Sequence, residues 1–187
     1  ESINLLAEGK AEIKENLEFL ASLNVLESAE IPTILGRIKS VSNGSAKKLL
    51  ADADYIFEGV PELIQAKKDA IARASDLASD QTIIASTTST MLVTQLMEFS
   101  SHPKNFLNAH FLNPAYLIPL VEVSPSDTTD QKNIDDFIGL LKSIGKVPII
   151  CKASPGYIIP RLQSLIMSEA ARMIEEGVAS AEDIDRA

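Results

Sequence analysis

The sequence is poor in several features that define whole classes of protein. One cysteine in 187 residues excludes an intrachain disulfide and is typical of a reducing, cytoplasmic environment. No apolar run is long enough to span a bilayer. Basic residues number 17 against 26 acidic ones, and the net charge of −9 argues against nucleic acid or an anionic membrane as a partner.

Two further absences concern the start of the chain. The sequence contains no Gly-x-Gly-x-x-Gly, the loop with which dinucleotide-binding folds approach a pyrophosphate. The first residues, Glu1-Ser2-Ile3, already have the pattern of a helix interior, without an initiator methionine or a signal peptide. We therefore expect the sequence to be an internal part of a longer polypeptide.

Hydrophobic residues make up 45% of the chain, enough for one globular core. Their spacing predicts strands at 34–41, 55–60, 82–86, 106–111, 116–123 and 147–152, the first leading into an Asn43-Gly44 turn. It predicts helices at 1–23, 46–51, 62–78, 93–99, 131–144 and 157–176. This alternation predicts an α/β three-layer sandwich, and its interruption after residue 106 predicts a mixed sheet.

The stretch 106–123 contains two apolar, β-prone runs joined through Asn113-Pro114, a turn-forming pair. Within these runs, His110 and Glu122 are the residues that can be charged near neutral pH. Both carry a desolvation cost unless they pair, and a carboxylate bound to an imidazole raises its basicity, as a general base requires. The alternative is a core histidine with satisfied hydrogen bonds and a glutamate at the surface.

Several collinear motifs then carry a resemblance. Residues 82–123 and 147–187 resemble the L-3-hydroxyacyl-CoA dehydrogenase family, the NAD-dependent enzymes of fatty-acid β-oxidation and butyrate metabolism. The motifs are Ala85-Ser86-Thr87-Thr88-Ser89, His110-Phe111-Leu112-Asn113-Pro114, Leu120-Val121-Glu122-Val123, Ser154-Pro155-Gly156-Tyr157 and Glu175-Glu176-Gly177-Val178-Ala179-Ser180.

The resemblance implies a Rossmann-like fold followed by the first long helix of an all-α domain. Residues 1–153 would be a partial dinucleotide-binding domain, and residues 154–187 the start of a C-terminal helical domain. The family's glycine-rich unit and most of its helical domain would lie outside this sequence. We therefore expect the 187 residues alone to have little or no activity.

By resemblance, the catalytic residues are His110, Glu122 and Ser89. His110 matches the base that takes the proton of the substrate 3-hydroxyl, and Glu122 matches the carboxylate that holds its ring. Ser89 matches a serine that contacts both the reacting oxygen and the nicotinamide region. The alternative for Ser89 is a helix cap, because serine and threonine clusters after strands commonly bind free helix N–H groups.

The resemblance also implies NAD as the cofactor, bound by Glu62, Lys67, Ser89 and Asn113, and it implies no metal. Glu62 and Lys67 equally fit a solvated helix, and a turn explains Asn113 nearly as well. Thr87 stands where many relatives have asparagine, which weakens any cofactor contact assigned there.

Pro160 is the larger departure, because relatives often have Gly-Phe-x-x-Asn-Arg where this chain has Gly156-Tyr157-Ile158-Ile159-Pro160-Arg161. Proline lacks the amide donor of the family asparagine.

The expected substrate is a short-chain 3-hydroxyacyl-CoA such as 3-hydroxybutyryl-CoA. Alternatives are a carnitine- or gulonate-type dehydrogenase and a non-catalytic, crystallin-like protein. The expected partners are the acyl-CoA substrate and a second copy, in a homodimer formed through the helical domain.

Overall fold

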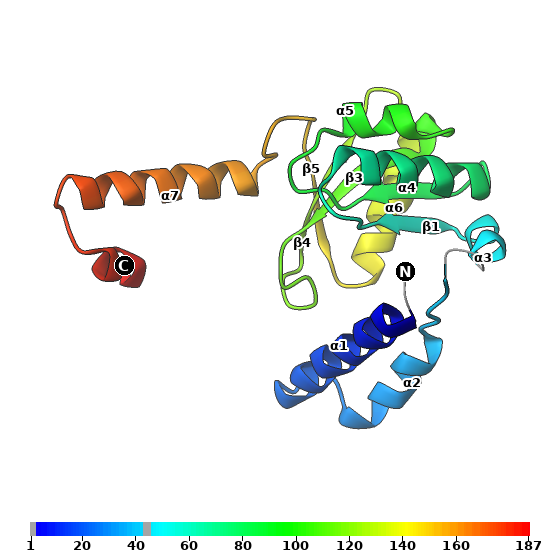
Figure 1. Ribbon diagram of the computed structural model, residues 1–187, viewed down its shortest axis with the longest axis horizontal. Coiled ribbons are helices and arrows are strands. Elements are labelled where there is room, and N and C mark those ends of the chain that lie inside the picture. The colour runs from blue at the N-terminus through cyan, green and yellow to red at the C-terminus, as the bar shows by residue number, and fades with distance from the viewer. Residues whose placement is uncertain (1–2, 43–45) are drawn as a thin grey trace. The chain divides into compact units, whose positions relative to one another are not determined.

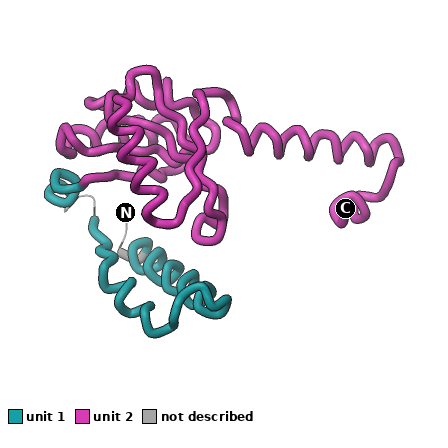
Figure 2. Tube along the Cα trace, turned by 180° about the vertical axis from the view of Figure 1, so that it is seen from behind, with its two compact units in different colours: residues 1–53 teal, residues 54–187 magenta. Residues whose placement is uncertain are grey.

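The computed structural model of the protein describes residues 3–42 and 46–187. These residues form two compact units, residues 1–53 and residues 54–187 (Figure 2). Among the helices described, none combines the length and apolar character needed to cross a membrane.

The first unit is helical and contains α1 (Ile3–Ser22), α2 (Ile31–Arg37) and α3 (Lys47–Ala51), with a 3-10 turn at Ser28–Glu30 (Figure 1). The strand predicted at 34–41 is wrong, because the first half of this segment belongs to α2 and the second half joins no sheet. Pro32 lies in the first turn of α2, where its fixed φ favours a helix, and a reciprocal hydrogen-bonded cap between Glu27 and Glu30 precedes it. The predicted Asn43-Gly44 turn lies outside the described residues.

The second unit contains a five-stranded sheet in the order β1-β2-β3-β4-β5. The pairs β1-β2, β2-β3 and β4-β5 are parallel, whereas β3 and β4 are antiparallel, so the predicted mixed sheet is confirmed. The strands are β1 (Tyr55–Glu58), β2 (Ile83–Ser86), β3 (Phe106–Phe111), β4 (Leu120–Pro125) and β5 (Val147–Ile150). The helices are α4 (Ile64–Leu77), α5 (Val93–Leu96), α6 (Gln131–Ser143), α7 (Ile159–Glu175) and α8 (Ala181–Arg186), with 3-10 turns at Met97–Phe99 and Pro103–Asn105.

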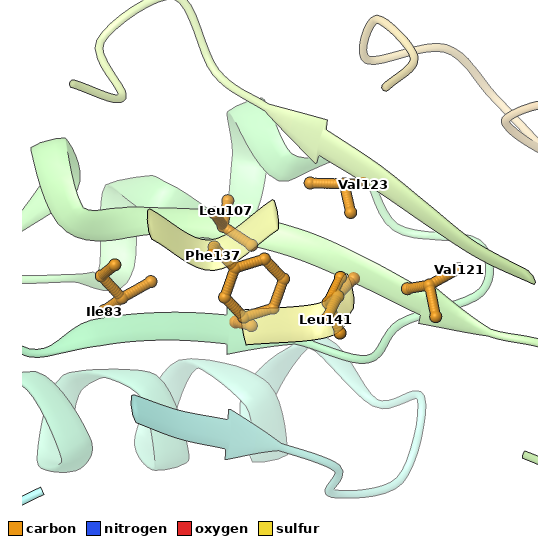
Figure 3. Close-up of a cluster of buried hydrophobic side chains, with 8 residues drawn as sticks. Ile83, Leu107, Val121, Val123, Phe137 and Leu141 are labelled. Atoms are coloured by element: carbon orange, nitrogen blue, oxygen red, sulfur yellow. The ribbon is translucent and has the colours of Figure 1, made fainter. Parts of the chain in front are cut away.

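Helices cover both faces of this sheet, with α4 and α5 on one side and α6 on the other (Figure 1). Phe137 and Leu141 of α6 pack on inward-facing residues of β2, β3 and β4 (Figure 3). On the opposite face, Ile71 of α4 packs with Ile84 and Phe106 of the strands. The predicted α/β three-layer arrangement is therefore confirmed, followed by the helices α7 and α8.

The strand predicted at 116–123 begins four residues later than expected, at Leu120. The Lys146 ammonium donates to the carbonyl oxygens of Ala115 and Ile118. The amide of Ile118 also donates to the carbonyl oxygen of Pro114, at 3.0 Å. These bonds form a compact turn, so residues 116–119 do not join the sheet.

The buried cluster around Phe137 leads to a prediction about stability. The Phe137 side chain is fully buried against the sheet, so Phe137→Ala leaves a cavity and should lower the free energy of unfolding by about 3–5 kcal/mol. Urea titration followed by circular dichroism measures this change. Ile144→Ala, at a 58% exposed position just beyond α6, is the control and should change stability by less than about 1 kcal/mol. Equal effects of the two substitutions would contradict the assigned core.

Candidate active site

Polar side chains gather on the face of the sheet that α4 and α5 cover. Successive residues of a strand point to opposite faces, so the strands that give apolar residues to α6 also place polar residues on this side, beside Ile84 and Phe106. Glu58 of β1, Ser86 of β2 and His110 of β3 all lie there, near the carboxyl ends of three neighbouring parallel strands. Open α/β sheets bind their ligands at this edge.

His110 and Glu122 lie directly opposite each other on the antiparallel strands β3 and β4. His110 Nδ1 is 2.7 Å from Glu122 Oε2, and the two residues are 5% and 0% exposed. An ionised carboxylate only accepts hydrogen bonds, so in the neutral ring Nδ1 carries the proton and Nε2 has a free lone pair. The predicted pairing is confirmed, and the alternative of a surface glutamate is wrong.

The second oxygen of Glu122 binds the start of α7. Oε1 accepts hydrogen bonds from the backbone N–H groups of Ile158 and Ile159, both at 2.8 Å. These amides belong to a helix N-terminus, whose partial positive charge favours a carboxylate. This contact was not predicted from the sequence, because nearly every residue has a backbone N–H and no residue type identifies the ones that bind a carboxylate.

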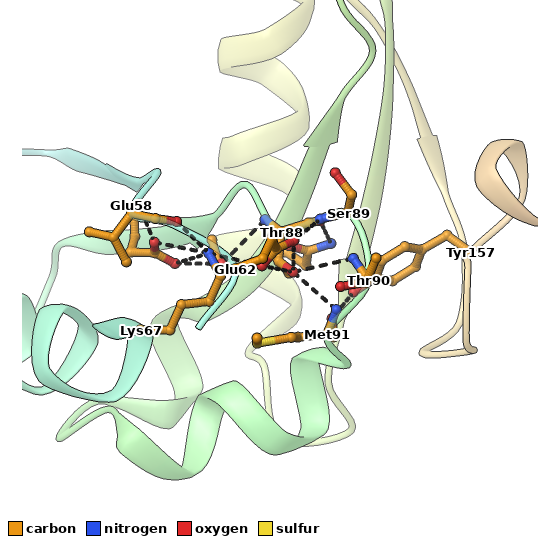
Figure 4. Close-up of polar contacts among 11 residues, drawn as sticks. Glu58, Glu62, Lys67, Thr88, Ser89, Thr90, Met91 and Tyr157 are labelled. Carbon is orange, nitrogen blue, oxygen red and sulfur yellow. Dashed lines mark hydrogen bonds and ion pairs between the residues drawn. The ribbon is translucent and has the colours of Figure 1, made fainter. Parts of the chain in front are cut away.

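A second buried group joins β1 to α4. The Lys67 ammonium lies 3.1 and 3.2 Å from the two carboxylate oxygens of Glu58, and Lys67 is 1% exposed (Figure 4). Glu58 also accepts from the Ser86 hydroxyl at 2.6 Å and from the Val60 amide at 2.7 Å. The solvated-helix interpretation of Lys67 is therefore wrong. Sequence reasoning missed Glu58, although a carboxylate in an apolar strand was the signal that identified Glu122.

Glu62 lies just before α4 and connects Lys67 to the loop after β2 (Figure 4). Its carboxylate accepts from the Ser89 amide at 2.7 Å and the Thr88 hydroxyl at 2.7 Å, and lies 3.4 Å from the Lys67 ammonium. Partial burial alone would raise the pKa of Glu62, but these two hydrogen bonds and the Lys67 charge outweigh it and lower the pKa. The carboxylate therefore stays ionised and fixes the loop.

Within this loop, Thr88 binds backbone N–H groups that precede α5, so it orders the loop without capping the helix. The Thr88 hydroxyl accepts from the amides of Thr90 and Met91 at 3.3 and 3.0 Å. The helix-cap alternative for Ser89 is wrong, since the N-cap of α5 is Leu92 and no side chain caps it. Ser89 instead faces a cavity.

The cavity has a volume of about 380 Å³ and brings together three of the predicted site residues. Ser89, His110 and Asn113 line it, whereas Glu62 and Lys67 support it from behind through the Ser89 loop. The remaining lining residues are Phe111, Leu112, Ile118, Pro160 and Gln163. Sequence reasoning did not find Gln163, which lies one helical turn after Pro160. Within residues 3–42 and 46–187, no cluster of side chains is suited to hold a metal ion.

Tyr157 completes the site from the segment before α7. Its ring stacks on that of His110, with centroids 6.3 Å apart and planes at 22°. Its hydroxyl donates to the Met91 carbonyl oxygen at 2.6 Å. Burial raises the pKa of Tyr157 well above its usual value, so the phenol keeps its proton for this bond.

The Lys67–Glu58 pair makes a prediction about stability. Lys67→Met leaves the Glu58 carboxylate buried without its cation, so we expect the free energy of unfolding to fall by about 3–5 kcal/mol in urea titration. Glu58→Gln combined with Lys67→Met should recover part of that loss. Lys132→Met, which breaks an exposed ion pair with Asp136, is the control and should leave the free energy of unfolding nearly unchanged. A Lys67→Met protein as stable as the parent would rule out the buried pair.

Comparison with known proteins places this geometry in a family. The model of the 3-hydroxyacyl-CoA dehydrogenase NAD-binding domain matches residues 2–154, and that of the 3-hydroxyacyl-CoA dehydrogenase C-terminal domain matches residues 156–187. The mitochondrial hydroxyacyl-coenzyme A dehydrogenase of Sus scrofa is 33% identical over 98% of this chain and 60% of its own length. The lambda-crystallin homolog of Homo sapiens is 38% identical over 71% of this chain and 42% of its own length.

Among solved structures, the (S)-3-hydroxybutyryl-CoA dehydrogenase of Ralstonia eutropha has a TM-score of 0.88 and 30% identity, over 97% of this chain and 63% of that chain. The chain therefore covers only part of the length of these relatives, 60% of the Sus scrofa protein and 63% of the Ralstonia eutropha structure. The resemblance found in the sequence motifs is confirmed. With both of its domain models matched along the sequence and the same fold in a relative of known structure, the chain belongs to the 3-hydroxyacyl-CoA dehydrogenase family.

Proposed function

We propose that the protein containing this chain catalyses the NAD-dependent oxidation of short-chain L-3-hydroxyacyl-CoA, such as 3-hydroxybutyryl-CoA, to 3-oxoacyl-CoA. The observation that carries the proposal is the His110–Glu122 pair, 2.7 Å apart and buried beside a cavity that Ser89 also lines. Family membership supports the same chemistry. This activity would contribute to fatty-acid β-oxidation or butyrate metabolism.

The proposed reaction needs a base for one proton and an acceptor for one hydride. His110 Nε2 takes the proton of the substrate 3-hydroxyl, and the negative charge of Glu122 stabilises the imidazolium that forms. Ser89 donates a hydrogen bond to the same oxygen, which orients the hydroxyl toward His110. In the direction of reduction, His110 returns the proton to the 3-keto oxygen.

The residues of the cavity fit the nicotinamide half of NAD. Ser89 and Asn113 offer a hydroxyl and an amide to the carboxamide region, and the partly exposed Glu62 carboxylate can accept from ribose hydroxyls. Lys67 is buried beneath Glu62 and acts by holding that carboxylate. When bound, NAD supplies the hydride acceptor. The printed sequence offers no glycine-rich loop for the pyrophosphate.

The proposed partners are the acyl-CoA substrate and a second copy of the chain, in a cytoplasmic homodimer formed through the helical domain. In support, α7 exposes a group of large apolar side chains, which apolar contacts would cover. These are Leu162, Leu165, Ile166, Met167 and Ile174. The free thiol of Cys151 is compatible with the cytoplasm.

Two alternatives rest on specific observations. Pro160 lines the cavity where the family asparagine is expected, which favours a carnitine- or gulonate-type 3-hydroxy acid as the substrate. Similarity to a lambda-crystallin homolog keeps open a non-catalytic protein on the same scaffold. The paired His110 and Glu122 argue against the second alternative, because a structural protein has no need of a buried base beside a cavity.

Replacing the base tests the proposed mechanism. His110→Gln in the full-length protein should lower kcat by about 10²- to 10⁴-fold while leaving the circular dichroism spectrum unchanged, because the amide cannot accept the proton. The assay follows NADH oxidation with acetoacetyl-CoA. His102→Gln, in the loop before Pro103, is the control and should keep full activity. Normal turnover by His110→Gln would remove His110 as the base.

A comparison of substrates separates the proposal from its alternatives. We expect kcat/KM for acetoacetyl-CoA to exceed that for the free 3-hydroxy acids carnitine and gulonate, measured as NADH consumed or formed. A preference for either free acid would favour the alternative suggested by Pro160. Absence of turnover with every substrate, in a full-length protein that binds NADH, would favour the non-catalytic scaffold.

A further inference from the structure

The turn between β5 and α7 has a strained backbone at a buried residue. Gly156 and Tyr157 have positive φ values of 73° and 42°. Glycine adopts this region freely, but a tyrosine persists there only where its surroundings hold it. Tyr157 is 4% exposed and its amide donates to the Ser154 carbonyl oxygen at 2.9 Å, so buried side-chain contacts and backbone hydrogen bonds together hold the turn.

Those contacts reach both halves of the candidate active site. The ring of Tyr157 stacks on the imidazole of His110, the same imidazole that bonds to Glu122. The hydroxyl of Tyr157 donates to the carbonyl oxygen of Met91, in the loop that follows β2. Figure 4 shows the Tyr157 side chain directed from its own segment toward this loop.

The loop is held at its other end by Glu62. The carboxylate of Glu62 accepts from the Ser89 amide and the Thr88 hydroxyl, and that hydroxyl also accepts from the Met91 amide. Ser89 therefore lies between two anchors, Glu62 on one side and the Tyr157–Met91 bond on the other. The backbone following Tyr157 meanwhile donates to Glu122.

We propose that Tyr157 is a positioning residue that sets the location of Ser89 relative to His110. Its ring holds the imidazole, and its hydroxyl anchors the loop that carries Ser89. One side chain thus links the two groups that bind the substrate oxygen in the proposed reaction, each of which also has its own carboxylate partner. The effect on turnover rests on the proposed function, whereas the mechanical link between Tyr157 and the loop does not.

The test is Tyr157→Phe in the natural full-length polypeptide, because phenylalanine keeps the stacked ring and removes only the hydroxyl. We expect amide hydrogen exchange of Ser89 and Met91 to become roughly three- to tenfold faster, as loss of one hydrogen bond implies. We expect kcat to fall by a similar factor with KM within about twofold, because the variant keeps the Ser89 hydroxyl and loosens only its position relative to His110. Tyr55→Phe, in β1 against Phe137, is the matched control and should change neither quantity.

A second variant, Tyr157→Leu, removes the ring as well. It should shift the ring resonances of His110 in NMR spectra, whereas Tyr157→Phe should leave them nearly unchanged. If Tyr157→Leu fails to fold, Tyr157→Phe still decides whether the hydroxyl anchors the loop that carries Ser89.

The outcomes separate the two claims. Faster loop exchange with reduced kcat in Tyr157→Phe supports the positioning role. Unchanged exchange would overturn the link, and faster exchange with unchanged kcat would overturn its part in turnover. Faster exchange in a protein whose parent form binds NADH but turns over no substrate would support the link and overturn the proposed function.

Discussion

Glu122 is a carboxylate with no exposure to solvent, and its charge is stable there because three hydrogen-bond donors surround it. One is the imidazole of His110, and two are the first amides of α7. Each donor constrains a different part of the chain. The imidazole requires the register of β3 against β4, and the amides require α7 to begin at one particular place. The hydrogen bonds of this one side chain therefore fix both the β3–β4 register and the start of α7.

The sheet makes such a site possible by having two unlike faces. Toward α6 its strands contribute apolar residues alone to the core, and toward α4 and α5 they contribute Ile84 and Phe106 together with the polar residues Glu58, Ser86, His110 and Glu122. The apolar clusters on both faces supply the stability with which the fold tolerates buried charge. Both carboxylates on the polar face are compensated, Glu58 by Lys67 and Glu122 by His110 and a helix N-terminus.

Two networks meet at the loop after β2. Glu62, with its lowered pKa, holds the Ser89 amide from one side, and the Tyr157 hydroxyl holds the Met91 carbonyl from the other. The cavity thus has walls from strand, loop and helix, each fixed by hydrogen bonds to the others. Such pre-organisation suits the proposed reaction, in which a hydride leaves a carbon atom and a proton leaves the oxygen bonded to it.

Part of this could be predicted from residue types. His110 and Glu122 stood out as charged residues in apolar strands, and a turn at Asn113-Pro114 brought them together. The strand predicted at 34–41 failed because its apolar residues also fit a helix that Pro32 initiates. The turn at 116–119 depends on Lys146, distant in sequence, and could not be seen locally. The amides that bind Glu122 could not be predicted either, because they are backbone groups distant in sequence. Glu58 is a different case, since it is a carboxylate in an apolar strand, the same signal that identified Glu122, and it was overlooked.

The measurement closest to the central claim is the ¹⁵N NMR spectrum of the neutral imidazole of His110. We expect a proton on Nδ1, bonded to Glu122, and an unprotonated Nε2 that is free to act as a base. This result does not depend on turnover, so it tests the geometry by itself. A neutral ring with its proton on Nε2 would rule out this arrangement, because Glu122 would then have no donor at Nδ1 and the nitrogen on the cavity side would have no lone pair for the substrate proton.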